Sequence, residues 1–92
     1  MTRLAASDEL DIVYKESYPV GSQVKIVPRA ALEEFQRTWR LHNPLQPEQL
    51  AFGDATATVE RVGYYFGGDV LYWLKGIPGT WHECCLAAVP DR

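Results

Sequence analysis

The side chains best suited to chemistry lie close together near the C-terminal end of this 92-residue chain, in the run His82–Cys85 (HECC). Imidazole and thiolate are preferred zinc ligands, and Asp69 or His42 could join them. A zinc site needs three or four ligands, and the sequence has no second pair at ligand spacing. We therefore predict no metal and no other cofactor. His82 is interpreted as a histidine near a turn, and the two thiols as small buried groups.

The same residue types suit nucleophilic catalysis, which needs a thiol beside a histidine that an acid orients. Cys84 or Cys85 with His42 and Asp69 would supply the groups. Nothing in their local sequence supports that arrangement. The chain also lacks a nucleophile elbow, a phosphate-binding glycine loop and a paired-carboxylate signature. We predict that the protein is not an enzyme and assign no catalytic residue.

Composition favours one small domain with its own core, since 47% of the residues are apolar. The net charge of −3 disfavours a nucleic-acid partner. The sequence has no run long enough for a signal peptide or a membrane span, which predicts no membrane association. Adjacent cysteines rarely bridge each other, so we expect a reduced, cytoplasmic protein.

The second half of the chain has the pattern of a β-meander. Residues 55–62 alternate, and Gly63 is predicted to form a bulge before 64–66. Residues 70–74 are apolar on both faces, which is typical of a covered strand. Glycine-centred turns are predicted at 67–69 and 76–79, followed by strands at 81–83 and 85–89.

The first half predicts a tail at 1–9, strands at 10–14 and 23–27, and a helix at 29–41. Leu32, Phe35 and Trp39 form the apolar stripe of that helix, and Glu33 with Arg37 is an i, i+4 pair. Residues 44–50 carry two prolines and are predicted to be a connecting loop with a single helical turn.

These patterns resemble an SH3-like small barrel over about residues 20–89. The resemblance rests on Gly21-x-x-Val24-x-Ile26, Gly53-x-Ala55-x-Ala57-x-Val59-x-x-Val62, Asp69-x-Leu71-Tyr72-x-Leu74 and Trp81-His82-Glu83 leading to Leu86. It implies a mainly β domain at 10–90, with about five short antiparallel strands and the helix inserted in the first long loop. The acidic cluster by which signalling SH3 domains bind proline-rich motifs is absent.

Aromatic residues flank the two predicted turns: Tyr64, Tyr65, Phe66, Tyr72, Trp73 and Trp81. A barrel this small cannot bury six large rings, because alternation directs every second side chain outward. Some of Tyr65, Trp73 and Trp81 should then be exposed and mark a binding surface. The alternative is that the helix stripe covers these rings as a second layer of core.

We therefore expect a non-catalytic binding module that recognises a protein segment or partner subunit. Its contacts are predicted at Tyr64, Tyr65, Trp73 and Trp81, with Arg37 and Arg40 steering an acidic partner. Two alternatives stay open. In one, the aromatics stack on single-stranded nucleic acid while Lys25, Arg29, Arg37 and Arg40 follow its backbone. In the other, the same patch makes the protein a self-associating structural subunit.

Overall fold

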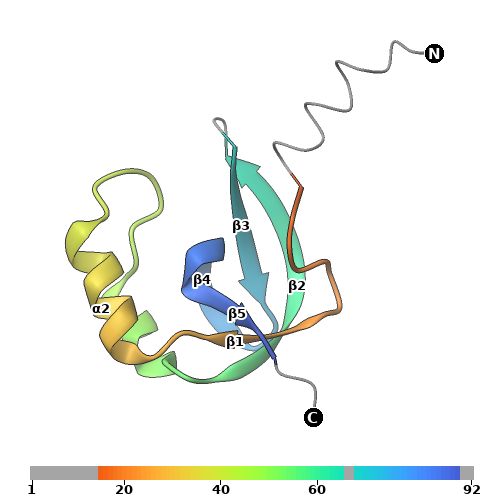
Figure 1. Ribbon diagram of the computed structural model, residues 1–92, viewed down its shortest axis with the longest axis horizontal. Coiled ribbons are helices and arrows are strands. Elements are labelled where there is room, and N and C mark those ends of the chain that lie inside the picture. Colours follow the sequence, from red (N-terminus) through yellow and green to blue (C-terminus); the bar gives the residue numbers. More distant parts are fainter. Residues whose placement is uncertain (1–14, 66–67, 90–92) are drawn as a thin grey trace.

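The computed structural model describes residues 15–65 and 68–89. Within these residues the chain is mainly β, with five antiparallel strands in one sheet, one α-helix and two 3-10 helices (Figure 1). The strands are β1 (Gln23–Ile26), β2 (Thr56–Tyr65), β3 (Asp69–Leu74), β4 (Ile77–His82) and β5 (Leu86–Ala88). The helices are α2 (Arg29–Thr38), η1 (Pro47–Phe52) and η2 (Glu83–Cys85). The mainly β class with one helix is confirmed.

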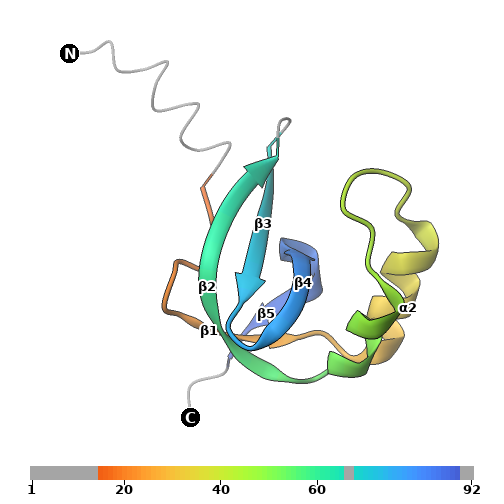
Figure 2. The ribbon, with the colours of Figure 1, turned by 180° about the vertical axis from the view of Figure 1, so that it is seen from behind.

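The long strand β2 connects the two halves of the sheet, whose strand order is β4-β3-β2-β1-β5. Its first residues pair with β1, and its remaining residues pair with β3. Figures 1 and 2 show that β2 curves strongly along its length, with α2 to one side of the strands. Strands β4 and β5 are the two edges, and the pairings described here leave the sheet open.

The irregularity in β2 lies earlier than predicted. The register with β3 shifts between Val59 and Arg61, and the strand continues through Gly63 without interruption. Gly63 has a different structural role. A Cβ atom at this position would lie only 2.8 Å from Cζ3 of Trp73. Gly63 is therefore a glycine because the indole of the neighbouring strand lies against its backbone.

Helix α2 begins at Arg29 as predicted but ends at Thr38 instead of Leu41. Trp39 caps it in an extended conformation, and its N–H donates to the carbonyl of Phe35 at 2.8 Å. The predicted pair of Glu33 with Arg37 is wrong. Glu33 pairs with Arg29 and Arg37 pairs with Glu34, both on the exposed surface of the helix.

The connection after α2 contains the predicted helical turn as η1, which extends beyond residue 50 to Phe52. Its buried side chain, Gln49, accepts a hydrogen bond from the backbone N–H of Gln46 at 2.8 Å. The same amide donates to the carbonyl of Thr80 at 3.2 Å. Both polar ends of Gln49 are thus satisfied, and the connection is attached to β4.

Trp81, a predicted partner contact, is fully buried in the core. The register of β3 with β4 places it opposite Tyr72, which is also fully buried. Directly opposed residues share a face of the sheet, so both rings face inward. The expectation that Trp81 reaches the surface is therefore wrong.

Other predicted features differ from the structure or lie outside the described residues. Cys84 and Cys85 lie in η2 and not on a strand, and the last strand is Leu86–Ala88. Ile77 to Gly79 belong to β4, so the second turn is shorter than predicted. The predicted tail, the predicted strand at 10–14 and Phe66 fall outside the described residues.

We predict that Trp81→Ala lowers the free energy of unfolding by about 3–5 kcal/mol, as expected for removing a buried indole. Trp73→Ala, in the neighbouring strand, should cost clearly less because Trp73 is only half-buried. Urea unfolding followed by circular dichroism measures both. Equal losses in the two variants would contradict the assignment of Trp81 to the core.

Candidate functional site

His82 lies where the segment after α2 meets the end of β4, and it connects these two parts of the chain. Its ring is almost fully buried. It lies 4.9 Å from the ring of Phe35 and 4.8 Å from that of Trp39, measured between centroids. Its Nε2 lies 2.9 Å from the carbonyl oxygen of Asn43. Because a carbonyl only accepts, Nε2 carries the proton and donates.

Burial lowers the pKa of His82 below its ordinary value, because the packed rings disfavour the charged imidazolium. The carbonyl of Asn43 opposes this shift, and the nearby His42 adds to it. His82 is therefore a neutral, structural hydrogen-bond donor at neutral pH.

His42 extends this group of rings to the hairpin between β2 and β3. Its imidazole stacks on the ring of Tyr65 at 3.5 Å and 8°. The indole of Trp39 meets it edge-on and donates from Nε1 to its backbone carbonyl at 2.6 Å. On the other side, Nε2 of His42 is buried and lies 2.9 Å from Oδ2 of Asp69, at ion-pair distance but not aligned as a hydrogen bond.

This arrangement decides the question of whether the helix stripe covers the aromatic residues. Trp39 packs on His42 and His82, and it leaves the ring of Tyr65 at the surface. Tyr65 is 43% exposed although one side of its ring is occupied by His42. Stacking on His42 thus supports a large ring at the surface, and such support lowers the entropic cost of using the ring in binding.

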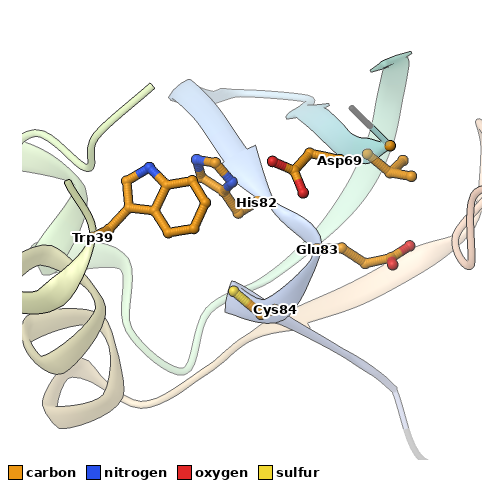
Figure 3. Close-up of a pocket in the computed structure, with 7 residues that line it drawn as sticks. Trp39, Asp69, His82, Glu83 and Cys84 are labelled. Atoms are coloured by element: carbon orange, nitrogen blue, oxygen red, sulfur yellow. The ribbon is translucent and has the colours of Figure 1, made fainter. Parts of the chain in front are cut away.

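A pocket of about 240 Å³ opens beside these rings. Its lining residues are Trp39, Gly68, Asp69, Val70, His82, Glu83 and Cys84. Figure 3 shows the carboxylate of Asp69 directed toward the ring of His82, and that of Glu83 turned away. The oxygen Oε2 of Glu83 is held instead by Tyr72 Oη and by the backbone N–H of Ser17.

Cys84 is exposed at the edge of this pocket, whereas Cys85 is buried, so only one of the two predicted buried thiols is buried. A hydrogen bond from the Cys85 thiol lowers the pKa of Cys84 to about 7, against the raising effects of burial and of the charges on Asp69 and Glu83. The same bond raises the pKa of Cys85. The hydrogen-bond partner of Cys84 is thus a thiol and not a histidine.

No group of three or more histidine, cysteine or acidic residues in the described part of the chain is arranged to hold a metal ion. Asp69, His82 and Cys84 do meet at one pocket, as the sequence allowed. Their shared surroundings are polar and aromatic, which suits the binding of a polar group.

The predicted aromatic patch is divided between the two faces of the sheet. Tyr65 is paired with Asp69, and Arg61 with Trp73, so Tyr65 and Trp73 share a face. Tyr64, its neighbour on the strand, points to the opposite face and donates from Oη to Glu16 at 2.7 Å.

Sequence reasoning missed Arg61, whose guanidinium lies over the indole of Trp73 at 4.1 Å. It also missed His42 and Asp69 as neighbours of Tyr65. The pairing of β2 with β3 brings these groups together. No local sequence motif indicates that they are neighbours. Arg37 and Arg40 are exposed and do not line the pocket.

Neither family models, nor curated proteins, nor solved structures give a match to this chain. Within the described residues, none of the helices combines the length and apolarity that crossing a membrane requires.

We predict that His82 makes the protein less stable as the pH falls. Its pKa is lower in the folded state, so the unfolded state takes up a proton first as the pH drops below about 6.5. The free energy of unfolding should therefore decrease from that pH down to the folded-state pKa, and then level off. His82→Gln keeps an amide donor for Asn43 but does not titrate.

Urea unfolding of both proteins between about pH 7.5 and pH 5.5 measures this difference. Parallel stability curves would show that His82 is not the group responsible.

We also predict that iodoacetamide modifies Cys84 alone in the folded protein, with a rate that is half-maximal near pH 7, the pKa of its thiol. Cys85→Ala removes the donor and should move this midpoint up toward the ordinary thiol value. Mass spectrometry of quenched samples identifies the modified residue. A midpoint that is the same in wild type and Cys85→Ala would exclude Cys85 as the cause.

Proposed function

We propose that this protein is a non-catalytic binding module that takes up a segment of a partner protein along the outer face of β2 and β3. The observation that carries this proposal is the ring of Tyr65, exposed on one side and stacked at 3.5 Å on His42 on the other. Rigid aromatic residues beside a pocket are the usual anchors of protein interfaces.

Trp73 and Arg61 extend the same face along the strands. The indole of Trp73 is half-buried. It packs against Gly63, and the guanidinium of Arg61 lies over its ring. Indole and guanidinium groups both contribute strongly to interfaces. A bound segment contacting Tyr65 would reach Trp73 along the same face of the sheet. Arg40 is the better candidate to steer an acidic partner, because Arg37 is engaged by Glu34.

The topology supports an SH3-like architecture for this module. Strand β5 pairs with β1, so the last strand lies beside the first, as in SH3-like barrels. Strand β2 curves so that it pairs with both β1 and β3. We propose that the sheet belongs to this class of small barrel, with α2 in the first long connection.

The surroundings of Tyr65 favour a protein partner over a nucleic acid. The carboxylate of Asp69 lies beside it and would repel phosphate. Two of the basic residues predicted to follow a nucleic-acid backbone, Arg29 and Arg37, are paired with acids on the helix. If the partner is instead a second copy of this chain, it would bind through the same face. A measurement of the molecular mass in solution distinguishes such a dimer from the monomer.

We predict that peptides selected on the immobilised protein from a random display library lose affinity at least tenfold in Tyr65→Ala, as expected when an interface anchor is truncated. Tyr64→Ala is the matched control, since it removes a similarly exposed tyrosine from the opposite face of the same strand. It should change affinity less than twofold by the same reasoning. Titration calorimetry measures both.

Equal losses in the two variants would contradict the proposed binding face. Failure to select any peptide, together with a concentration-dependent dimer in analytical ultracentrifugation, would favour self-association instead.

A further inference from the structure

We propose that the pocket between Trp39, Asp69, His82 and Cys84 receives a lysine or arginine side chain of the bound segment. This inference rests on the proposed function and specifies the chemistry of the partner. The pocket opens beside Tyr65, since Asp69 is paired with Tyr65 across the hairpin and also lines the pocket. A segment anchored on Tyr65 can therefore place one side chain into it.

The size of the pocket suits one side chain. Its volume of about 240 Å³ is below the roughly 300–1,000 Å³ of sites for whole small molecules. Val70 and the indole of Trp39 provide apolar contacts for the methylene groups of a long side chain. The electron-rich faces of aromatic rings also attract cations.

The charge of the pocket selects a cation. Asp69 is 47% exposed, and His42 is its one partner in the described part of the chain. Burial lowers the pKa of His82 and the Cys85 hydrogen bond lowers the pKa of Cys84, and the negative charge of Asp69 opposes both shifts. Two groups on different elements therefore experience a negative potential in this pocket, and none of its lining residues is a lysine or arginine.

His82 is not suited to neutralise this potential. Burial lowers the pKa of His82, so that ring is neutral at neutral pH. His42 is stacked on Tyr65 and reaches one oxygen of Asp69 from the buried side. A carboxylate has a second oxygen, which can accept a hydrogen bond from an ammonium or guanidinium group.

The direct test needs no peptide. N-acetyl-lysine methylamide is titrated into ¹⁵N-labelled protein, with N-acetyl-norleucine methylamide as its uncharged control. We expect the lysine probe to shift the amide signals of Gly68, Asp69 and Cys84, with millimolar affinity, and the norleucine probe to leave them unchanged. N-acetyl-arginine methylamide is titrated in the same way. Equal responses to charged and uncharged probes, or no response to either charged probe, overturn the inference.

Asp69→Asn should weaken the lysine probe about fivefold, the upper end for a partly exposed ion pair. Glu48→Gln is the matched control, because it removes the same charge from an exposed residue of η1 outside the pocket. It should have no effect. Equal weakening by the two variants would show a general charge effect and overturn the inference.

A selected peptide then separates this inference from the proposed function. Replacing its lysine by norleucine should weaken binding to wild type about fivefold but leave binding to Asp69→Asn unchanged, because the two changes remove the same contact. Peptides that require Tyr65 but carry no lysine or arginine would overturn the cation pocket and leave the proposed function intact. Lysine-probe binding without any selectable peptide would support the pocket and reject the binding module.

Discussion

The arrangement of this molecule depends on the hydrogen bond from His82 to the carbonyl of Asn43. It joins residues 39 positions apart, and it fixes the segment that follows α2 against the end of β4. The buried imidazole satisfies a backbone carbonyl while its faces pack on Phe35 and Trp39. An apolar residue in its place would remove this donor and, with it, the hydrogen bond that joins Asn43 to β4. The neutral His82 thus helps to hold α2 beside the sheet, together with Leu32, which the helix buries in the core.

The candidate site is a consequence of that attachment. Once the segment after α2 is fixed, His42 lies against Tyr65 and close to Asp69. The C-cap of α2 contributes Trp39, β3 contributes Asp69, and η2 contributes Cys84 to one pocket. Each of these side chains comes from a different element, so the site exists only when the helix is docked. A ligand bound at this site would therefore stabilise the docked position of the helix.

The irregularity between Val59 and Arg61 adds one residue to β2 relative to β3. It determines which aromatic residues reach the surface. Val59 and Val62 both lie opposite core residues of β3 although they are three positions apart. The irregularity between Val59 and Arg61 makes this possible, because regular alternation would place Val59 and Val62 on opposite faces. Because of this irregularity, Arg61 and Tyr65 lie on the outer face of the sheet, and Tyr64 lies on the opposite face. An irregularity at Gly63, as the sequence suggested, would have divided these residues differently.

The sequence by itself determined the type of the α-helix and of strands β1, β2 and β3, because periodicity is a local property, but it did not predict η2. The two-residue alternation of 23–27 and 55–62, the apolar run 70–74 and the helical stripe through Leu32 each correspond to an element of the predicted type. Only the tertiary structure decided that Trp81 is core, that Tyr65 is surface, and that Asp69 meets His42. These outcomes follow from strand register and helix docking, which depend on contacts between residues far apart in the chain. Local pattern carries no information about such contacts, and one extra residue in a strand reverses the face of every residue after it.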